Sequence, residues 1–518
     1  MPTLNLADIS RVHARENPQG EALVFNGEVT TYAELDERVN RVANGLAAED
    51  LPIQTRVGYL SKNAPNYFEI VLGCAKSRNV MVAVNTRLAA PEVKYILEDA
   101  DAQILFVGKE FYPMIEALEG ELTRIGKIIA LDGGHERWES YADWRDKQSA
   151  DDPTLPYDPE DDFEQLYTSG TTGHPKGVQL THGAWFPAVD AATKVDWAAY
   201  EPGETALICM PVFHVAGSNS GLFSLMQGTR TVIVADFDPQ EILRLLDEYD
   251  VNHTFFVPAV ILALIHQPNV GEFDYSSLRN IAYGASPIAE AVLLKAREVF
   301  GCNFTQLYGL TENLGLATQL PPADHDPARG KLRSCGLPYE GSEIRILGAD
   351  GNELPAGEVG EICLKSDWLM KGYWNRPEAT ADSMQDGWFH TGDAGYFDED
   401  GYLYIHDRLK DMIISGGENI YPAEVENALF AHPAVADVAV IGVPDERWGE
   451  AVKAIVVRKP GEELTAGELI DFARERIARY KAPRSVDFVE ELPRNPSGKV
   501  LRRELREQYW QGRDRQVS

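Results

Sequence analysis

The chain has 518 residues, 44% hydrophobic and 25% charged, which is typical of a globular protein with about two to four domains. Lys and Arg together number 48 and Asp and Glu 81, so the formal net charge is −33. A general nucleic-acid binder is excluded by this charge, because phosphate contacts need clustered cations. The five cysteines lie far apart without a CxxC pair, so we expect a reducing compartment and neither a disulfide framework nor a zinc site.

No targeting segment is visible in the sequence. The first residues lack a basic stretch followed by an apolar one, and no run approaches the ~18 apolar residues of a membrane span. The last four residues, 515–518, carry no peroxisomal or prenylation signal. We therefore expect a cytoplasmic protein without a membrane span.

The first 150 residues alternate between helical and strand patterns. Apolar residues recur at helical spacing between Thr31 and Ala48, and Val80 to Val84 is a short apolar run typical of a buried strand. Such alternation predicts a layered α/β architecture. The stretch from Asp151 to Glu164 contains seven acidic residues and three prolines, which predicts an exposed linker.

A second α/β alternation follows this stretch. Residues 242–249 have a helical pattern, and residues 253–257 form a buried-strand pattern that stops at Pro258. Beyond residue 340, closely spaced glycines predict small β-hairpins. The last region has strand patterns at 435–443 and 452–457 and an amphipathic helix at 468–480, and it is locally basic, with 12 Lys and Arg against 8 Asp and Glu from residue 471 onward.

The strongest local motif is the Gly/Ser/Thr-rich stretch from Tyr167 to Gly177. Its three glycines allow backbone N–H groups to point into one concavity, where they can hold phosphate oxygens, and Lys176 adds a positive charge. It is not a Walker A loop, because Pro175 stands where that pattern requires a glycine before the lysine. Such a stretch standing alone is usually a flexible loop.

Four further motifs accompany this loop in a fixed order. They are Tyr308-Gly309-Leu310-Thr311-Glu312, His390-Thr391-Gly392-Asp393, Asp407-Arg408-Leu409-Lys410-Asp411 and Asn495-Pro496-Ser497-Gly498-Lys499. Together with the loop, they resemble the adenylate-forming superfamily in order and spacing over nearly the whole chain. Within it, Asn85-Thr86-Arg87-Leu88 and residues 415–422 look most like bacterial fatty-acyl-CoA synthetases.

The resemblance implies a fold and a reaction. The implied fold has a large N-terminal domain of layered α/β subdomains with a small β-rich part, residues 1–408, and a small, mobile α+β C-terminal domain, residues 409–518. The implied reaction is ATP-dependent: a carboxylate attacks the α-phosphate, pyrophosphate leaves, and the thiol of coenzyme A then displaces AMP from the acyl-adenylate. ATP, Mg²⁺ and coenzyme A are the implied cofactors, with a small carboxylic acid as the further partner and a homodimer as the expected assembly.

The resemblance also assigns roles to residues of the nucleotide site. Glu312 matches the Mg²⁺ ligand, a hard oxygen donor, and Lys499 matches a mobile catalytic lysine whose cation stabilises transition-state charge. Asp393 matches the residue that accepts hydrogen bonds from the ribose hydroxyls. The implied catalytic residues are Lys499, Glu312 and Thr168. The implied ATP- and AMP-binding residues are Thr168, Ser169, Gly170, Thr171, Thr172, Gly173, Lys176, Gly284, Ala285, Ser286, Tyr308, Gly309, Thr311, Asp393 and Arg408.

The acyl pocket is expected to consist of small or apolar residues. His214 resembles the aromatic position between ATP and the acyl group, and it stands where amino-acid-activating relatives usually carry an Asp, so an α-amino acid substrate is disfavoured. A core histidine is the alternative for His214. Ala259, Val260, Gly309 and Leu316 complete the expected pocket, to which Gly284, Ala285 and Ser286 also contribute.

Residues for the thiol step lie in the last region. Lys410 matches a hinge about which the C-terminal domain rotates between the two half-reactions. Ser415, Gly416 and Gly417 would then face the active site and leave room for the pantetheine arm, with Trp448 beside them. The alternative for Gly416 and Gly417 is a tight turn.

The predicted function is therefore an AMP-forming acyl-CoA synthetase for medium- or long-chain fatty acids. The alternatives are an aryl- or hydroxycinnamate-CoA ligase and an acyl-adenylate ligase that loads a separate carrier protein. A fused carrier domain is not expected, because the chain ends 19 residues after Lys499. A luciferase-like monooxygenase is disfavoured by the missing peroxisomal tail, and a non-catalytic nucleotide binder by the completeness of the motifs.

Overall fold

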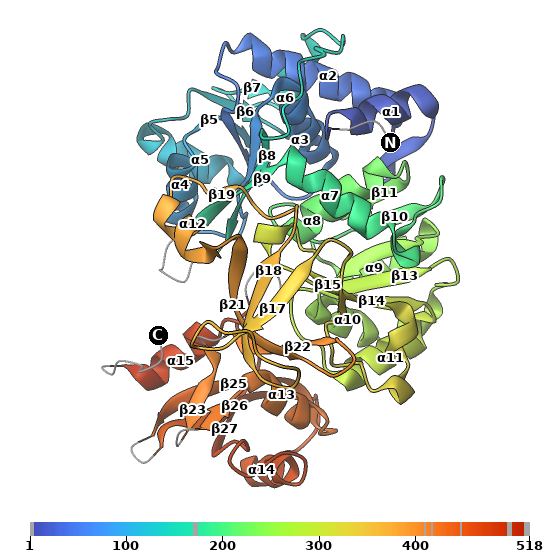
Figure 1. Cartoon of the computed structure of the whole chain (residues 1–518). Helices are drawn as coiled ribbons and strands as arrows, with labels where there is room; N and C mark the ends of the chain where they lie inside the picture. Colours follow the sequence, from blue (N-terminus) through green and yellow to red (C-terminus); the bar gives the residue numbers. More distant parts are fainter. Residues whose placement is uncertain are drawn as a thin grey trace.

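The computed structural model of the chain describes residues 5–168, 175–408, 411–415, 418–445, 448–494 and 500–511 (Figure 1). These residues build four β-sheets and the helices that cover them, so the predicted α/β class is confirmed. The α-helices are α1 Asp8–Glu16, α2 Tyr32–Ala48, α3 Pro65–Ser77, α4 Ala90–Asp99, α5 Tyr112–Leu118, α6 Tyr141–Asp146, α7 His182–Thr193, α8 Val215–Met226, α9 Pro239–Glu248, α10 Pro258–Ile265, α11 Glu290–Phe300, α12 Pro377–Ser383, α13 Pro422–Phe430, α14 Ala466–Arg474 and α15 Arg502–Trp510.

The first sheet has the order β16-β15-β14-β13-β12-β10-β11-β1-β2. Its strands are β1 Glu21–Phe25, β2 Glu28–Thr31, β10 Thr205–Ile208, β11 Arg230–Ile233, β12 His253–Phe256, β13 Asn280–Gly284, β14 Asn303–Tyr308, β15 Thr318–Leu320 and β16 Leu337–Pro338. The run from β14 through β10 to β1 is parallel, and antiparallel pairs flank it at both sides. The carboxyl ends of β10, β12, β13 and β14 therefore share one edge.

The second sheet has the order β19-β9-β8-β4-β3-β5-β6-β7. Its strands are β3 Arg56–Leu60, β4 Val80–Ala83, β5 Ala102–Val107, β6 Lys127–Ala130, β7 Glu139–Ser140, β8 Asp162–Thr168, β9 Lys176–Thr181 and β19 Gly372–Tyr373. Strands β8 and β9 form an antiparallel hairpin, with Thr168 opposite Lys176 at its tip. The Gly/Ser/Thr-rich stretch thus connects the two strands of a hairpin at the edge region of this sheet.

Helices α3 and α8 lie between the two large sheets. α3 packs on β4 and β8 of the second sheet, and α8 packs on β10 and β11 of the first. The two helices touch so closely that a Cβ at Gly221 of α8 would stand 2.3 Å from the ring of Phe68 on α3. Helices α9, α10 and α11 share an apolar core on the other face of the first sheet, and α4 and α5 share one on the other face of the second. The result is a stack of alternating helix and sheet layers.

The elements predicted from periodicity are largely confirmed. Helix α2 begins where its sequence places a capping box, in which the Thr31 side chain accepts from Glu34 N and the Glu34 carboxylate accepts from Thr31 N. The predicted strands at 80–84 and 253–257 are β4 and β12.

The exposed linker predicted for 151–164 is wrong at its end. Strand β8 begins at Asp162, and Asp162, Phe163 and Glu164 are all buried. Asp162 accepts a 2.6 Å bond from Arg56 and Asp161 pairs with Arg78, so these acidic residues are neutralised by partners that composition cannot reveal.

Glu164 is a fully buried carboxyl between the central helices. It accepts hydrogen bonds from Tyr67 of α3 and from Ser218 Oγ of α8, the latter at 2.8 Å. Burial raises the pKa of Glu164 from 4.5 to about 7, against the lowering effect of these two donors. Between pH 4.5 and about 7, the Glu164 carboxyl is therefore mainly protonated in the folded protein and mainly ionised in the unfolded chain.

We expect a Glu164→Gln variant to lose part of the pH dependence of stability. The raised pKa makes its full favourable contribution to the free energy of unfolding below pH 4.5, and this contribution is lost as the pH rises to about 7. Between pH 5 and 8, the free energy of unfolding of the unmodified protein should fall by about 2–3 kcal/mol more than that of the variant. Denaturant unfolding at both pH values measures this difference, and parallel pH profiles would contradict the buried-proton assignment.

A third sheet is formed by strands between residues 343 and 408. Its order is β17-β18-β21-β20, with β22 pairing β21. Its strands are β17 Glu343–Leu347, β18 Gly360–Lys365, β20 Met384–Gln385, β21 Trp388–Phe397 and β22 Leu403–Arg408. This is the small β-rich part that the glycine spacing beyond residue 340 predicted.

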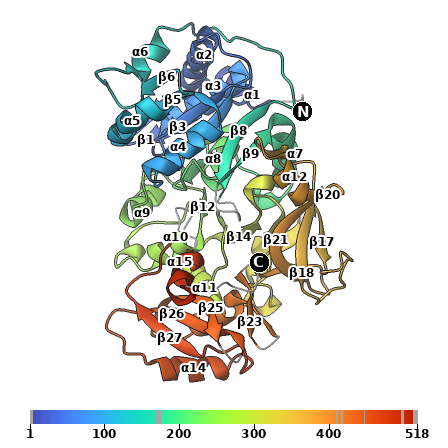
Figure 2. The ribbon, with the colours of Figure 1, turned by 90° about the vertical axis from the view of Figure 1, so that its left-hand side faces the viewer.

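The fourth sheet belongs to the C-terminal part, which lies at the bottom of Figures 1 and 2. Its order is β24-β23-β26-β25, with β27 pairing β26, and its strands are β23 Ile413–Ser415, β24 Glu418–Ile420, β25 Val435–Asp445, β26 Gly449–Arg458 and β27 Ser485–Val489. Helix α13 packs on β22 of the third sheet. Phe430 at its end contacts the core of α9–α11, so this part rests on the large N-terminal part.

The helix predicted at 468–480 is shorter than expected. Helix α14 ends at Arg474, and the next bonds are Arg476 N to Ala473 O at 2.9 Å and Ile477 N to the same oxygen at 2.9 Å. Ile477 and Ala482 contact the C-terminal core, so the chain turns inward here to reach β27.

In the described residues, no helix is long and apolar enough to cross a membrane. All five cysteines lie in the described part of the chain and all are free, so the expectation of no disulfide is confirmed. Cys302 is partly exposed and the other four are buried.

Candidate active site

The carboxyl edge of the first sheet gathers the predicted pocket residues. His214 follows β10, Ala259 and Val260 follow β12, Ala285 follows β13 and Gly309 follows β14. Ligands of open α/β sheets bind at this edge. The four segments lie far apart in sequence and are brought together only by the parallel strand order.

His214 is the N-cap of helix α8. Its side chain makes no capping hydrogen bond, and its ring lies 4.7 Å from that of Phe213. The residue as a whole is partly exposed. At the neighbouring strand end, Pro258 occupies the first turn of α10 and so places Ala259 and Val260 at the start of that helix.

Two glycines of the site allow backbone segments to approach each other closely. A Cβ at Gly309 would stand 2.2 Å from the Gly315 carbonyl carbon, and one at Gly284 would stand 2.2 Å from Leu307 O. Any other residue at these positions would displace backbone. Leu316 ends the same turn, and its carbonyl accepts a 2.7 Å bond from Trp368 Nε1.

Tyr308 and Asp393 form a buried hydrogen bond. The Tyr308 hydroxyl donates to Asp393 Oδ2 at 2.9 Å, and each residue is 8% exposed. Burial, and next the Asp393 charge, raise the pKa of Tyr308 well above its usual value, so the phenol remains a donor. Asp393 lies on β21 opposite Arg408 of β22. Two predicted nucleotide residues, 85 positions apart, are therefore in direct contact.

Glu312 and Lys176 meet at a third residue, Tyr373. The Tyr373 hydroxyl donates to Glu312 Oε1 at 2.8 Å, and Lys176 Nζ lies 4.7 Å from the centre of the Tyr373 ring. Tyr373 reaches this position because β19 pairs with β9, where it is opposite Val178. Glu312 is buried, at 7% exposure, within the short 3-10 turn Thr311–Asn313. Its carboxylate is a hard oxygen donor beside a cation, which suits a divalent metal bound with phosphate.

A second network of hydrogen bonds holds the ends of the hairpin formed by β8 and β9. Asp99, the last residue of α4, accepts a 2.8 Å bond from the Tyr167 hydroxyl and a bond from Arg376. The Tyr95 hydroxyl donates to Pro175 O at 3.2 Å on the other side of the hairpin. Nothing in the sequence singles out Asp99, Tyr95 or Tyr373, because their contacts arise from tertiary pairing.

Some predicted residues lie outside the described part of the chain. They are Ser169, Gly170, Thr171, Thr172, Gly173, Lys410, Gly416, Gly417 and Lys499. For Arg408 the structure describes the strand alone. Thr168 ends β8 opposite Lys176, and Thr311 opens the 3-10 turn of Glu312.

Ser415 and Trp448 are neighbours in the C-terminal part. Ser415 of β23 pairs with Gly449 of β26, directly after Trp448. Ser415 is buried, and the Arg484 guanidinium lies 4.9 Å from the centre of the Trp448 ring.

Comparison with known proteins gives two matching family models. The model described as AMP-binding enzyme matches residues 10–374, and the model described as AMP-binding enzyme C-terminal domain matches residues 424–499.

Similar proteins cover nearly the whole chain. A fatty acid–acyl-carrier-protein ligase, ScoC, of Streptomyces coeruleorubidus is 42% identical over 517 residues, which are 99% of this chain and 98% of that protein. A feruloyl-CoA synthase of an Amycolatopsis species is 39% identical over 501 residues, 96% of this chain and 97% of that protein. Among solved structures, the anthranilate CoA ligase AuaEII in complex with anthranoyl-AMP superposes with a TM-score of 0.90 at 28% identity and covers 98% of both chains.

Proposed function

The chain belongs to the family of AMP-binding enzymes, and from this premise we propose that it is an AMP-forming ligase that joins a carboxylic acid to coenzyme A. The observation that carries the proposal is the convergence of three separate motifs: Tyr308 bonds to Asp393, and Glu312 meets the loop residue Lys176 through Tyr373. The convergence supports a nucleotide site with a ribose end and a phosphate end.

In the first half-reaction, a carboxylate oxygen attacks the α-phosphorus of ATP and the bond to pyrophosphate breaks. Asp393 would accept hydrogen bonds from the ribose hydroxyls, and Thr311 would contact the α-phosphate. Lys176, with residues 168–173, would hold the β- and γ-phosphates, because positioning and charge neutralisation dominate phosphoryl-transfer catalysis. Mg²⁺ held by Glu312 would neutralise charge on the phosphate oxygens.

In the second half-reaction, the thiol of coenzyme A attacks the acyl carbon. The bond between this carbon and the oxygen that bridges it to phosphorus breaks, so AMP leaves with the bridging oxygen. We propose that Lys499 acts only in the first half-reaction. For Lys499 to leave the site before the thiol arrives, residues 409–518 would form a domain that rotates about Lys410. Ser415, Gly416, Gly417 and Trp448 would then face the thiol path. The pairing of Ser415 with Gly449 beside Trp448 supports a common surface for these residues.

For the acid, we propose a medium- or long-chain fatty acid. The candidate pocket residues Ala259, Val260 and Leu316 are apolar and carry no charge to match a polar tail. An aryl acid is the alternative, which the 39% identity to a feruloyl-CoA synthase favours. A carrier protein as the thiol is a second alternative, which the 42% identity to an acyl-carrier-protein ligase favours.

The experiment that tests the function is an assay of products by mass. The protein is incubated with ATP, Mg²⁺ and a panel of fatty and aryl acids, with coenzyme A, with a carrier protein, or with neither thiol. We expect acyl-adenylate without a thiol and fatty acyl-CoA with coenzyme A. Thioester on the carrier alone would identify a carrier-loading ligase, and no adenylate from any acid would contradict the proposal.

The Tyr373 hydroxyl is expected to support metal and phosphate binding. Because a Tyr373→Phe variant removes one hydrogen bond to the Glu312 carboxylate, we expect the KM for Mg²⁺-ATP to rise about fivefold. A matched control is Tyr402→Phe, which removes a 2.8 Å bond to Asp324 from a tyrosine of equal exposure, 8%. Equal KM changes in both variants would show that the Tyr373 effect is structural.

His214→Ala is expected to change the KM for the acid more than the KM for ATP, because the ring would wall the acyl pocket. The His214 side chain caps no backbone group of α8, so its loss should leave the melting temperature nearly unchanged. Steady-state kinetics with acids of different length measure the change. A variant that unfolds at the assay temperature would support the core-histidine alternative.

The proposal includes a cytoplasmic location, where ATP and coenzyme A are supplied, and a homodimer as the assembly. Light scattering at the concentrations used in the assays measures the molar mass and so tests the homodimer.

A further inference from the structure

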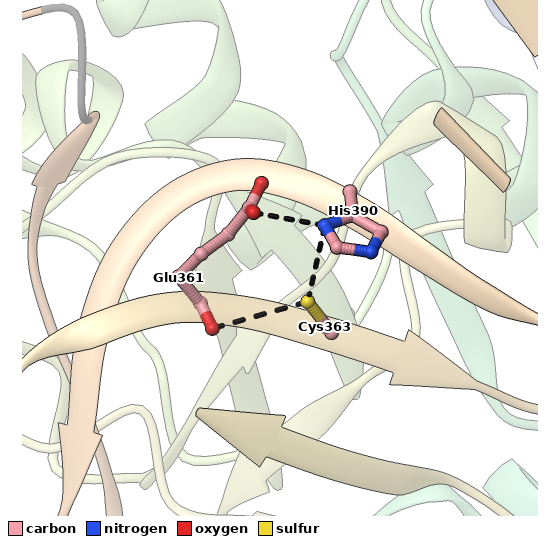
Figure 3. A group of neighbouring side chains, drawn as sticks. All are labelled: Glu361, Cys363 and His390. Carbon is pink, nitrogen blue, oxygen red and sulfur yellow. Dashed lines mark hydrogen bonds and ion pairs between the residues drawn. The ribbon is translucent and has the colours of Figure 1, made fainter. Parts of the chain in front are cut away.

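Strands β18 and β21 bring three metal-binding side chain types together. Cys363 lies directly opposite His390 in the register of the two strands, and Glu361 lies two residues before Cys363 on the same face of β18. Figure 3 shows the three side chains pointing toward one another. One ligand atom from each lies within 4.8 Å of the others. The cluster was not expected from the sequence, because Cys363 and His390 share no local motif.

The cluster is held by hydrogen bonds that meet at the His390 ring. His390 Nδ1 lies 2.8 Å from Glu361 Oε2 and 3.5 Å from Cys363 Sγ. Donors around a tetrahedral Zn²⁺ with bonds of ~2.0 Å to N and O and ~2.3 Å to S stand roughly 3.3–3.5 Å apart. Small side-chain shifts would therefore convert the hydrogen-bonded cluster into a metal-binding one.

From this arrangement we infer that Glu361, Cys363 and His390 form a site for one thiophilic divalent cation of the Zn²⁺ class. The donor set of one sulfur, one imidazole nitrogen and one carboxylate oxygen suits Zn²⁺ or Co²⁺ rather than Mg²⁺. The His390 and Glu361 side chains are 20% and 25% exposed, which leaves the cluster a solvent side for entry and for a water as fourth ligand. Because a cysteine binds such a cation as a thiolate, binding releases the Cys363 proton.

The site is coupled to the Tyr308–Asp393 pair through a β-bulge. The register of the two strands shifts between Glu361 and Cys363, and the extra residues of β21 include Gly392, whose φ is +71°. Glu361 Oε1 accepts a 3.1 Å bond from Gly392 N, directly before Asp393. Bulges beside active sites aim side chains. Glu361 Oε2 is the oxygen that faces His390, so a cation bound there would pull on the same carboxylate whose Oε1 holds Gly392 N, and would thereby shift the position of Asp393.

Metal binding is tested directly with Co²⁺ as the probe, which needs no enzyme activity. We expect one Co²⁺ per chain, a thiolate-to-cobalt charge-transfer absorption, and release of about one proton per ion bound. Cys363→Ala should abolish the absorption. Cys302→Ala, which removes the partly exposed cysteine, is the matched control and should retain it. Absence of the absorption, or its persistence in Cys363→Ala, would overturn the site.

The effect on nucleotide rests on the proposed function and is measured separately. With Zn²⁺ at saturation, we expect the Kd for ATP to rise about fivefold or more in the unmodified protein and to stay unchanged in Cys363→Ala. Cobalt binding with an unchanged ATP affinity would overturn the coupling and leave the metal site standing. No ATP binding even without Zn²⁺ would contradict the proposed function and not the site.

Discussion

Lys499→Ala is expected to lower the rate of acyl-adenylate formation about 100- to 1,000-fold, with ATP affinity nearly unchanged. The reason is that a cation at the attacked α-phosphate stabilises charge that develops in the transition state, and removal of one such group costs about 10²–10³ in rate. Single-turnover formation of adenylate measures the loss. ATP binding in the absence of acid measures the ground state.

The second half-reaction provides the internal control for this variant. Thioester formation from pre-formed acyl-adenylate should remain close to that of the unmodified enzyme, because the proposal assigns Lys499 to the first half-reaction alone. Arg503→Ala removes a positive charge from the same basic region at a residue that is 82% exposed, and it should leave both halves intact. A parallel loss of both half-reactions in Lys499→Ala would mean that this lysine supports the fold.

Asp393→Ala is expected to raise the KM for ATP about 100-fold. Its carboxylate would accept two hydrogen bonds from the ribose, each worth about 1.5–3 kcal/mol as a bond to a charged group. The substitution also deprives the buried Tyr308 hydroxyl of its acceptor. Tyr308→Phe keeps the carboxylate and removes only the phenol, so it should raise the KM by about tenfold or less.

A substrate lacking one ribose hydroxyl separates recognition from general damage. The unmodified enzyme should discriminate strongly between ATP and 2′-deoxy-ATP, because the deoxy sugar leaves the carboxylate one donor short. Asp393→Ala should have lost this discrimination. A variant that still discriminates as the unmodified enzyme does would place the ribose elsewhere.

Secondary structure was predictable where local signals agree with burial. The capping box at Thr31 and Glu34 defines the start of α2, and Pro258 separates β12 from α10, both within a few residues of chain. The errors at 162–164 and 475–480 have a tertiary cause. Arg56 and Arg78 lie far from this segment in the sequence, yet their side chains neutralise Asp162 and Asp161. At 475–480, the contact of Ile477 with the C-terminal core turns the chain inward.

The site was predictable as a set of motifs and not as a set of contacts. Glu312 and Lys176 were named from motif order, whereas their connection through Tyr373 depends on the pairing of β19 with β9. Asp99 precedes Tyr167 by 68 residues and Arg376 follows Asp99 by 277, so no local pattern could reveal their network. The Cys363–His390 pair likewise depends on strand register.

The central claim, that the carboxylate attacks the α-phosphorus of ATP, is tested most directly by oxygen transfer. The acid is labelled with ¹⁸O in its carboxylate and converted with ATP and coenzyme A, and the products are weighed. The account predicts one labelled oxygen in AMP and none in pyrophosphate, because the oxygen that formed the bond to phosphorus stays on AMP when the thiol attacks. Label in inorganic phosphate, with ADP as the nucleotide product, would contradict it.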